Sequence, residues 1–445
     1  MKIIKYTRPL LAALVYARPT ASATKTNNNP TLPLSTDSTF NFQYMIALGD
    51  AITGGSDIGP VLGAAKNIKD GDMASFSEQF YKLANQTKAH AQDPANAYDP
   101  VNVRETWFSA AQYFRRADMF LHNNWSNPLI NRLWTEQTQA FNKALAALPI
   151  PGKRIRIPAK EGNFIVEAIW YGASESGDRK LPTLVIGNGL DAAQEDSYHY
   201  FVAGALARGW NCITYDGPGQ PTVRREQNIG FIPKWETVVN PVVDYVLSEK
   251  SQVVDEDRLV LVGNSFGGYL AARAAAFEPR LSAVVLVDGV WDTYAGYASQ
   301  LSPELIAVYE AGNYTEFDHK LLSLREAGKL ATSAAWGLDY GLWSFNTHSP
   351  SEFFTQSKLF RLEDVVDKIK MPVFVGDAEF ENIFQGQPKQ VKDALGDKAT
   401  LHLFPGVAGY HCQTGAGQDL TRTIFAWLHK TLGKANDEWC YSSLC

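Results

Sequence analysis

The sequence predicts an α/β fold with a mostly parallel central sheet, an N-terminal helical cap domain and a helical lid inserted above the sheet. Three observations support this fold class. From residue 154 onward, short β-branched runs alternate with helical patterns, which is typical of an open α/β sheet. Several of these runs are apolar without alternation, as expected for parallel strands covered on both faces. Residues 40–150 show helical periodicity without strand alternation.

Length and these changes of pattern divide the chain into segments. At 445 residues it is about three times a typical domain length, so more than one structural unit is expected. The expected segments are a signal peptide (1–23), a linker (24–39), the helical cap domain (40–150), the first part of the α/β core (151–290), the helical lid insertion (291–365), the second part of the core with the acid and the histidine (366–433) and a C-terminal tail (434–445).

The first 23 residues have the pattern of a secretory signal. A basic start precedes a short apolar run at 10–17, and Ala21-Ser22-Ala23 matches a cleavage site. The sequence therefore predicts a secreted protein; a disordered basic leader on a cytoplasmic protein is the alternative. Sequons at Asn85, Asn124 and Asn313 are compatible with a glycoprotein.

Individual elements follow from the same patterns. The strands that we expect are 155–158, 164–171, 183–187, 212–215, 259–262, 283–287, 373–375 and 400–404. Helices are expected at about 103–122 and 134–148 in the cap, and at about 195–208, 234–250, 267–277, 386–395 and 418–432 in the core. The remaining segment, 291–365, is too long for a single connection between two parallel strands, and we expect it to be a helical insertion.

Composition excludes several classes of protein. Hydrophobic residues make up 45% and charged residues 20%, which is ordinary for a packed globular chain and excludes disorder throughout. The net charge of −6 leaves no basic excess for nucleic acid. No apolar stretch approaches the length of a membrane span. Cys212 lies in an apolar run and is expected to be a buried small hydrophobe. A homodimer is compatible with the sequence.

The strongest motif is Gly263-Asn264-Ser265-Phe266-Gly267, which follows an apolar strand and precedes an Ala-rich helix. G-x-S-x-G in this context is the nucleophile elbow. The glycines allow a turn so tight that a Cβ two residues from the serine would clash with a neighbouring element. The turn holds the serine in a strained conformation that lifts its hydroxyl out of the sheet. Ser265 is therefore the expected nucleophile.

A serine hydroxyl needs a base, and in folds with this elbow the partners follow in the order serine, acid, histidine. Of the histidines after Ser265, only His411 lies just past the last expected strand, in a Gly-containing loop. His411 is the expected base. The others lie in the lid, in a strand or in the terminal helix: His319, His348, His402 and His429.

The acid should follow the strand before that histidine. Counted from the proline that opens this strand, the usual acid position falls on Glu381, which would fix the imidazole tautomer and stabilise the imidazolium. Glu379 is the first alternative, and Asp288, at the end of the preceding strand, is the second. Asp377 is expected to be a structural carboxylate at the strand end.

The oxyanion hole is expected from two backbone N–H groups. Residues 184–191 run from a strand into a loop with Gly187 and Gly189, where this fold places one donor; the other is the amide after the nucleophile. The expected donors are the N–H groups of Leu190 and Phe266. A plain tight turn is the alternative interpretation of the two glycines.

The expected lid is rich in aromatic residues. One interpretation is an aromatic surface over an apolar substrate. The other is that these rings pack the insertion onto the core, as most buried aromatics do. The sequence does not decide between them.

Five motifs together resemble the α/β-hydrolases of fungal secondary metabolism, namely the fusarin- and cytochalasan-pathway hydrolases and the pigment-pathway hydrolases that shorten polyketides. These enzymes look related to the bacterial 2,6-dihydropseudooxynicotine hydrolase. The resemblance covers about residues 45–432, including Gly54-Gly-x-Asp57. The motifs are Gly263-Asn-Ser-Phe-Gly-Gly-Tyr269, Asp216-Gly-Pro-Gly-Gln220, Trp235-Glu-x-Val-Val-x-Pro-Val-Val-Asp244, Glu379-x-x-x-x-Phe-x-Gly-Gln-Pro388 and His411-Cys-Gln-x-Gly-Ala416.

This resemblance implies an α/β-hydrolase fold whose helical N-terminal part caps the active site, with His411 matching the family's base. The chain departs from the family at Glu381, where Asp is usual. Family chemistry includes ester, C–C bond and ring-forming acyl transfer. We therefore expect hydrolysis of an ester, thioester or C–C bond in a small, apolar, polyketide-like metabolite. A C–C lyase, a ring-forming acyl transferase and a non-catalytic binding homologue are the alternatives; a peptidase is disfavoured by the helical N-terminal part.

No metal or organic cofactor is expected. The motifs include neither a zinc-ligand pair nor a dinucleotide loop, and Asp216-Gly-Pro-Gly-Gln220 is a Gly-rich turn without G-x-G-x-x-G spacing.

Overall fold

A mostly parallel eight-stranded sheet forms the centre of the fold, in a computed structural model that describes residues 30–175, 177 and 179–433. The chain divides into two units, Met1–Pro33 and Leu34–Cys445, and the helices and strands described below lie in the second. The expected signal peptide lies outside the described residues and stays a prediction.

The strand order in the sheet is β1-β2-β4-β3-β5-β6-β7-β8. Strands β1 and β2 are antiparallel, β2 pairs antiparallel with β4, and all other pairs are parallel. Every expected strand is present. The strands are β1 Lys153–Pro158, β2 Ile165–Tyr171, β3 Leu181–Gly187, β4 Asn211–Asp216, β5 Val254–Gly263, β6 Ala283–Leu286, β7 Val373–Ala378 and β8 Ala399–Phe404.

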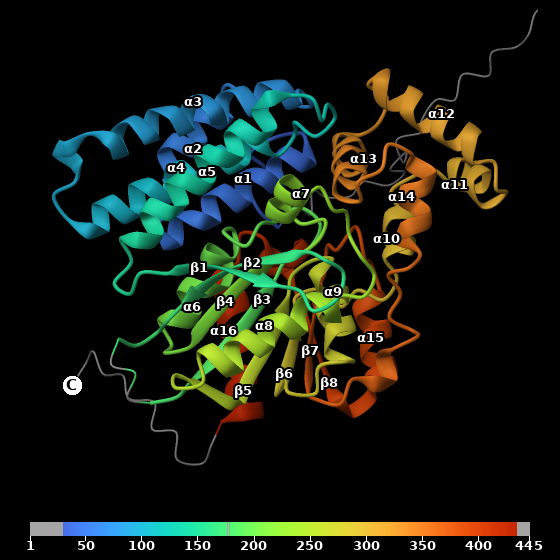
Figure 1. The fold of residues 1–445 in the computed structure, drawn as a ribbon. Helices are drawn as coiled ribbons and strands as arrows, with labels where there is room; N and C mark the ends of the chain where they lie inside the picture. Colours follow the sequence, from blue (N-terminus) through green and yellow to red (C-terminus); the bar gives the residue numbers. More distant parts are fainter. Residues whose placement is uncertain (1–29, 176, 178, 434–445) are drawn as a thin grey trace, which may run out of the picture. The chain divides into compact units, whose positions relative to one another are not determined.

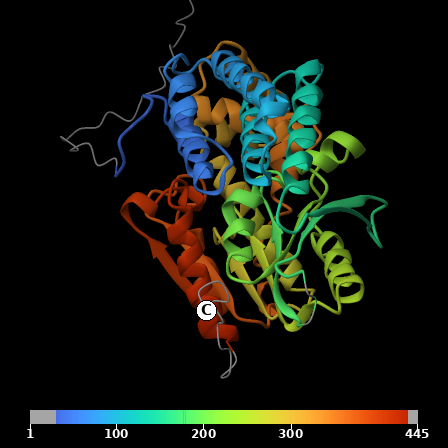
Figure 2. The same ribbon diagram turned by 90° about the vertical axis from the view of Figure 1, so that its left-hand side faces the viewer.

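Helices cover both faces of the sheet, which explains its apolar, non-alternating strands. Apolar residues of α8 and α9 pack on one face, and those of α6 and α16 pack on the other; Figure 2 shows α16 (red) and α8 (yellow-green) on opposite sides. The short α7 was not expected from the sequence. The core helices are α6 Ala203–Leu206, α7 Pro221–Gln227, α8 Glu236–Glu249, α9 Gly267–Ala275, α15 Gln387–Leu395 and α16 Gly417–Leu432.

The N-terminal helices form a cap above the sheet (Figure 1). Several of these helices begin after an Asp or Asn whose side chain accepts a hydrogen bond from a backbone N–H group in the first turn. Asp37, for example, accepts from the N–H groups of Thr39 and Phe40. Phe108 of the cap stacks on Tyr198 of the core with ring centroids 4.5 Å apart. The cap helices are α1 Ser38–Asp50, α2 Ile58–Ala65, α3 Met73–Gln92, α4 Pro100–Asp118 and α5 Pro128–Ala146.

The expected lid is helical and lies beside the cap (Figure 1). Most of its aromatic side chains are buried within one apolar cluster that also includes the core, among them Tyr309, Phe317, Phe353 and Phe354. Most of the lid aromatics therefore pack the insertion onto the core, which was the second of the two interpretations given above. The lid helices are α10 Thr293–Ala298, α11 Pro303–Glu310, α12 Tyr314–Glu326, α13 Thr332–Ser344 and α14 Pro350–Ser357.

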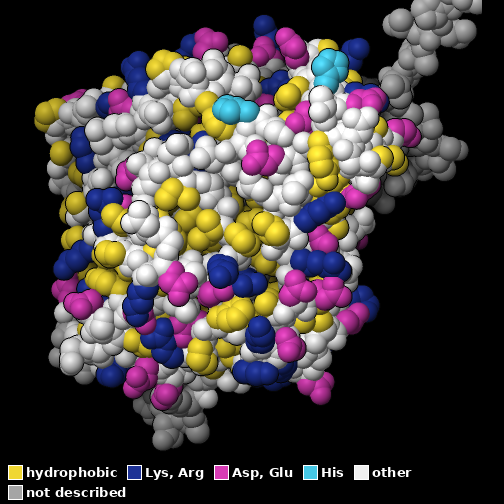
Figure 3. All heavy atoms as spheres, turned by 45° about the vertical axis from the view of Figure 1, so that its right-hand side comes forward, with side chains coloured by type: hydrophobic (Ala, Val, Ile, Leu, Met, Phe, Trp, Pro, Cys, Tyr) yellow, Lys and Arg dark blue, Asp and Glu magenta, His cyan; other side chains and the backbone are white. Residues whose placement is uncertain are grey.

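The surface of the described residues mixes both signs of charge. In Figure 3, apolar side chains gather across the middle of one face, whereas Lys, Arg, Asp and Glu are interspersed below them. Of the helices described, none combines the length and the apolar character that a membrane crossing requires. Cys212 is fully buried, as its apolar surroundings predicted.

Packing around the elbow predicts an unequal response to two glycine substitutions. A Cβ on Gly268 would lie 1.8 Å from the backbone oxygen of Asp288, whereas a Cβ on Gly337, inside α13, would meet no atom within 4 Å. Gly268→Ala should lower the free energy of unfolding by at least about 2 kcal/mol. Gly337→Ala should raise it by up to about 1 kcal/mol through helix propensity. Urea denaturation measures both; equal midpoints would contradict this packing.

Candidate active site

The residues expected to be functional gather at one edge of the sheet. The carboxyl ends of parallel strands meet at the same edge, which is where open α/β sheets bind ligands. The groups and the strands that they follow are Leu190 after β3, Ser265 and Phe266 after β5, Asp288 after β6, Glu381 after β7 and His411 after β8.

Ser265 occupies a strained turn between β5 and α9. Its φ angle is +58°, a left-handed conformation that costs about 1–2 kcal/mol for a residue with a Cβ. Glycines on both sides make the turn possible: a Cβ on Gly263 would lie 2.1 Å from the oxygen of Gly267, and one on Gly267 would lie 2.7 Å from the oxygen of Asn188. The elbow geometry expected from the motif is present.

His411 lies between Ser265 and two carboxylates. Its Nε2 is 2.9 Å from Ser265 Oγ, and its Nδ1 is 2.7 Å from Glu381 Oε2. Nδ1 is also 2.8 Å from Asp288 Oδ2. The side chain of His411 is 12% exposed, while those of Glu381 and Asp288 are almost completely buried. The structure thus brings the expected base beside the expected acid and one of its alternatives.

The two carboxylates differ in their surroundings. Glu381 Oε1 accepts backbone N–H bonds from Ile383 and Phe384 at 2.8 and 3.0 Å. Burial alone would raise the pKa of Glu381, but the His411 imidazolium and these hydrogen bonds lower it to about 2. Burial raises the pKa of Asp288 to about 6, although His411 opposes that shift. Glu381 is therefore the carboxylate that is ionised throughout the neutral range.

The remaining candidates point elsewhere. Glu379 Oε2 accepts the N–H of Gly406 at 2.7 Å, so this carboxylate fixes the loop before His411. Asp377 lies within β7 and accepts the N–H of Ala378. The other histidines after Ser265 lie on α12, in the loop before α14, on β8 and on α16: His319, His348, His402 and His429.

The pKa of His411 is raised well above its ordinary value. Burial opposes the imidazolium, but the negative charge of the Glu381 and Asp288 carboxylates outweighs it. Asp288, His411 and Cys412 are also the one group of metal-ligating side chain types that lie close together within the described residues. Burial raises the pKa of Cys412 to about 12. Its thiol is therefore protonated at neutral pH and poorly suited to hold a metal.

The loop after β3 lies directly against the elbow. A Cβ on Gly189 would be 2.9 Å from the N of Phe266 and 3.0 Å from Ser265 Cβ, so only glycine allows this approach. Gln220 fixes the same loop, since its Nε2 donates to Asn188 O at 2.7 Å and its Oε1 accepts from Gly217 N at 2.8 Å. This contact gives a physical role to the Asp216–Gln220 turn.

Sequence reasoning missed several groups around the site. Asp191 is half-buried, and loss of solvent raises the pKa of its carboxyl even though Arg115, the largest opposing charge, lowers it. Asp191 acts electrostatically on His411 and on Tyr297 of the lid. Phe42 of the cap and Phe384 lie with ring centroids 6.4 and 6.2 Å from that of His411. The sequence signal was the position of Asp191, directly after an expected oxyanion donor.

Comparison with known proteins identifies the family. Residues 184–412 match the model of the alpha/beta hydrolase family. Hydrolase LUC6 from Fusarium sp is 31% identical over 415 residues, which cover 90% of this chain and 98% of that protein. The chain belongs to the alpha/beta hydrolase family. The resemblance expected from the motifs is thereby confirmed.

Another relative and a solved structure are also similar to this alpha/beta hydrolase over most of its length. The 20-hydroxy-prefusarin hydrolase FUS2 from Gibberella moniliformis is 28% identical over 89% of this chain and 97% of its own length. The crystal structure of the 2,6-dihydroxy-pseudo-oxynicotine hydrolase superposes with a TM-score of 0.68 at 18% identity, covering 86% of this chain and 95% of that chain. The second likeness supports the fold.

Removal of either carboxylate should shift the pH profile of this hydrolase. Negative charge beside Nδ1 stabilises the imidazolium, so the acid limb of kcat/KM should lie above pH 6.5 in the parent enzyme. Glu381→Gln removes a full charge and should move the limb to lower pH by about one unit. Asp288→Asn should also move it to lower pH, because Asp288, with a pKa of about 6, is mostly ionised above pH 6.5 and raises the pKa of His411 too.

Asp393→Asn provides the control for these two variants. This carboxylate pairs with Lys389 on the exposed surface of α15, so its removal changes the net charge equally and should leave the profile in place. A limb that stays unmoved in both Glu381→Gln and Asp288→Asn would contradict the electrostatic account of His411.

Proposed function

We propose that this alpha/beta hydrolase cleaves an ester, thioester or C–C bond of an apolar, polyketide-like metabolite through a Ser265–His411–Glu381 triad, in the biosynthesis of a secondary metabolite. The continuous contact from Ser265 Oγ to His411 Nε2, 2.9 Å, and from His411 Nδ1 to Glu381 Oε2, 2.7 Å, carries the proposal. Both distances lie within hydrogen-bond reach, as a nucleophile, its base and the group that orients the base require.

In the proposed first step, His411 Nε2 takes the proton of the Ser265 hydroxyl while Oγ attacks the carbonyl carbon of the substrate. Glu381 holds the proton on Nδ1 and stabilises the imidazolium. The N–H groups of Leu190 and Phe266 stabilise the oxyanion, for which donors of this type contribute a few kcal/mol each. Protonation of the leaving group by His411 then yields an acyl-enzyme, which water hydrolyses by the same sequence.

The class of substrate is inferred from the surroundings and from the relatives. Phe42, Tyr297 and Phe384 are close to His411 through ring contacts or electrostatic coupling, so apolar groups are expected to lie beside the reacting carbonyl. The relative FUS2 is named for hydrolysis of 20-hydroxy-prefusarin. Both observations favour a hydrophobic natural product over a peptide or a sugar.

A second candidate is C–C cleavage with His411 as an acid–base group on the substrate and Ser265 near the oxyanion. The raised pKa of His411 favours this candidate, because the imidazolium is available as a proton donor at neutral pH. The two routes differ in whether an acyl-enzyme forms. Rapid quenching followed by intact mass spectrometry would detect that adduct on Ser265 in the covalent route only.

Ser265→Ala should abolish turnover of p-nitrophenyl esters and labelling by a fluorophosphonate. We expect a loss of kcat of at least about 10³-fold, since removal of a serine nucleophile disables the whole triad. The melting temperature should not fall, because the substitution removes only the hydrogen bond between Ser265 and His411.

Activity-based labelling, ester hydrolysis and differential scanning fluorimetry measure these effects. Ser248→Ala, which removes an exposed hydroxyl that bonds only Asp244 O, is the matched control. Full activity or full labelling in Ser265→Ala would refute the assignment of the nucleophile.

A further inference from the structure

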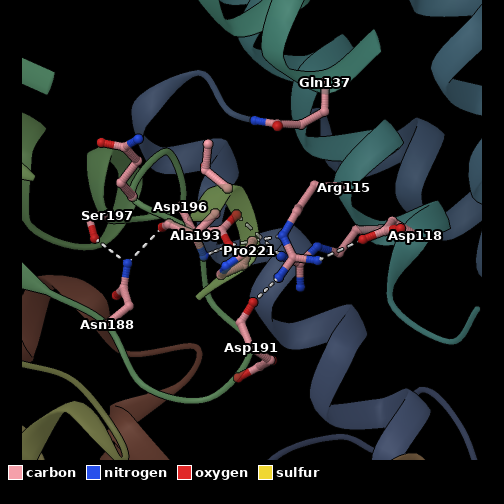
Figure 4. A network of polar contacts seen from close by, with 12 residues as sticks. Arg115, Asp118, Gln137, Asn188, Asp191, Ala193, Asp196, Ser197 and Pro221 are labelled. Carbon is pink, nitrogen blue, oxygen red and sulfur yellow. Dashed lines mark hydrogen bonds and ion pairs between the residues drawn. The ribbon is translucent and has the colours of Figure 1, made fainter. Parts of the chain in front are cut away.

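The carbonyl oxygen of Asp191 receives hydrogen bonds from two domains. Asp191 follows Leu190, the proposed oxyanion donor, so its carbonyl group lies two peptide units beyond the donor N–H group. Arg115 Nη2 of α4 in the cap donates to Asp191 O, as Figure 4 shows. The hydroxyl group of Tyr340, on α13 in the lid, donates to the same oxygen at 3.2 Å. The cap and the lid therefore both bond one oxygen atom of the loop after β3.

Arg115 is itself held rigidly. Its Nε donates to Asp196 Oδ2 at 3.1 Å, and its Nη1 lies 3.7 Å from Asp118 Oδ2. Asp196 Oδ2 also accepts the N–H of Ala193 at 2.9 Å, so the same carboxylate joins the arginine to the far end of the loop. Arg115 is 1% exposed. A buried guanidinium with these partners has little freedom to move, and it transmits the position of α4 to the loop.

Core groups fix the opposite side of the loop. Asn188 Nδ2 donates to Ala193 O at 2.6 Å and to Ser197 Oγ at 2.8 Å (Figure 4), and Gln220 bonds Asn188 O. These contacts act on residues before and after the proposed donor. Gln220 Nε2 also donates to the oxygen of Gly189, in the donor's own peptide unit, at 3.4 Å. The Asp191 carbonyl, two peptide units beyond the donor, is held by Arg115 and Tyr340.

We propose that Arg115 and Tyr340 are positioning residues that hold the Leu190 N–H group toward the reacting carbonyl, so that the oxyanion hole is complete only when the cap and the lid are both packed against the core. This inference rests on the proposed function, because it concerns the donor in that mechanism. Rotation of the Leu190–Asp191 segment would turn the donor away while leaving Ser265, His411 and Glu381 in contact.

Tyr340→Phe tests the lid contact with a matched control in Tyr309→Phe. Both tyrosines are buried in the lid, but the Tyr309 hydroxyl bonds Thr355 inside the lid instead of the loop. For a p-nitrophenyl ester, kcat of Tyr340→Phe should fall about tenfold relative to Tyr309→Phe, while KM stays within about twofold, since a displaced oxyanion donor weakens only the transition state. Equal kcat values, or a loss confined to KM, would overturn the role of Tyr340.

Arg115→Lys tests the cap contact. Lysine keeps a charge for Asp196 but cannot bond Asp196 and Asp191 O together as the guanidinium does. Arg224→Lys is the control, because Arg224 is buried and bonds Trp343 O and Asn346 without contact to the loop. We expect a kcat about tenfold lower in Arg115→Lys than in Arg224→Lys. Equal values would overturn the role of Arg115.

Hydrogen exchange separates this proposal from the proposed function. The backbone amides of residues 188–194 should exchange faster in Tyr340→Phe and Arg115→Lys than in the two controls, whether or not the parent enzyme turns over the ester. Unchanged exchange would overturn the positioning role. Failure of the proposed function would appear separately, as absence of fluorophosphonate labelling at Ser265 in the parent enzyme.

Discussion

The tight bend at Ser265 is the constraint on which the rest of the site depends. Backbone atoms of three neighbouring segments close on it: the oxygen of Asn188 after β3, the oxygen of Asp288 after β6 and the oxygen of Gly267 at the start of α9. Only glycine fits at 263, 267 and 268 in this packing. The bend therefore fixes the position of the Ser265 hydroxyl relative to the loop after β3 on one side and to Asp288 on the other.

A histidine placed beside this bend must be oriented by an acid, and here two acids reach the same nitrogen. Their oxygens lie 2.7 and 2.8 Å from His411 Nδ1, yet their environments differ. The His411 imidazolium and two backbone N–H groups keep Glu381 ionised, whereas burial makes Asp288 partly neutral near pH 6. Pairs of carboxylates whose pKa values are pushed apart take different roles. In the proposed triad the ionised carboxylate, Glu381, orients His411, and Asp288 adds to the negative charge around the same nitrogen.

Buried charge connects the cap to this centre. Arg115, Asp118 and Asp196 are each 5% exposed or less. Transfer of such ions out of water costs several kcal/mol each unless they are paired. The Arg115–Asp196 pair forms only while α4 lies against the loop after β3, because the arginine comes from the cap and Asp196 from the core. The guanidinium that makes this pair also holds the Asp191 carbonyl, two peptide units beyond the proposed oxyanion donor.

The elements of this fold that depend on neighbouring residues could be predicted from the sequence alone. Eight strands, the principal core helices and the order of Ser265, Glu381 and His411 follow from periodicity, from glycines with a steric requirement and from a motif whose neighbours confirm its context. These features involve residues within a turn or a strand of each other, where the chain itself dictates geometry. The packing of the lid aromatics was left open because burial depends on what lies opposite each ring.

Only the tertiary structure decided the long-range pairings. Asp288 and Glu381 are 93 residues apart in the numbering of the chain, yet both reach His411, and no spacing rule predicts that a second carboxylate shares the nitrogen. Arg115 and Tyr340 both bond the carbonyl oxygen of Asp191, although α4 precedes it and α13 follows it at long distances in the sequence. Such contacts depend on how separately formed elements pack, because side chains that meet across domains leave no periodic signal in the sequence.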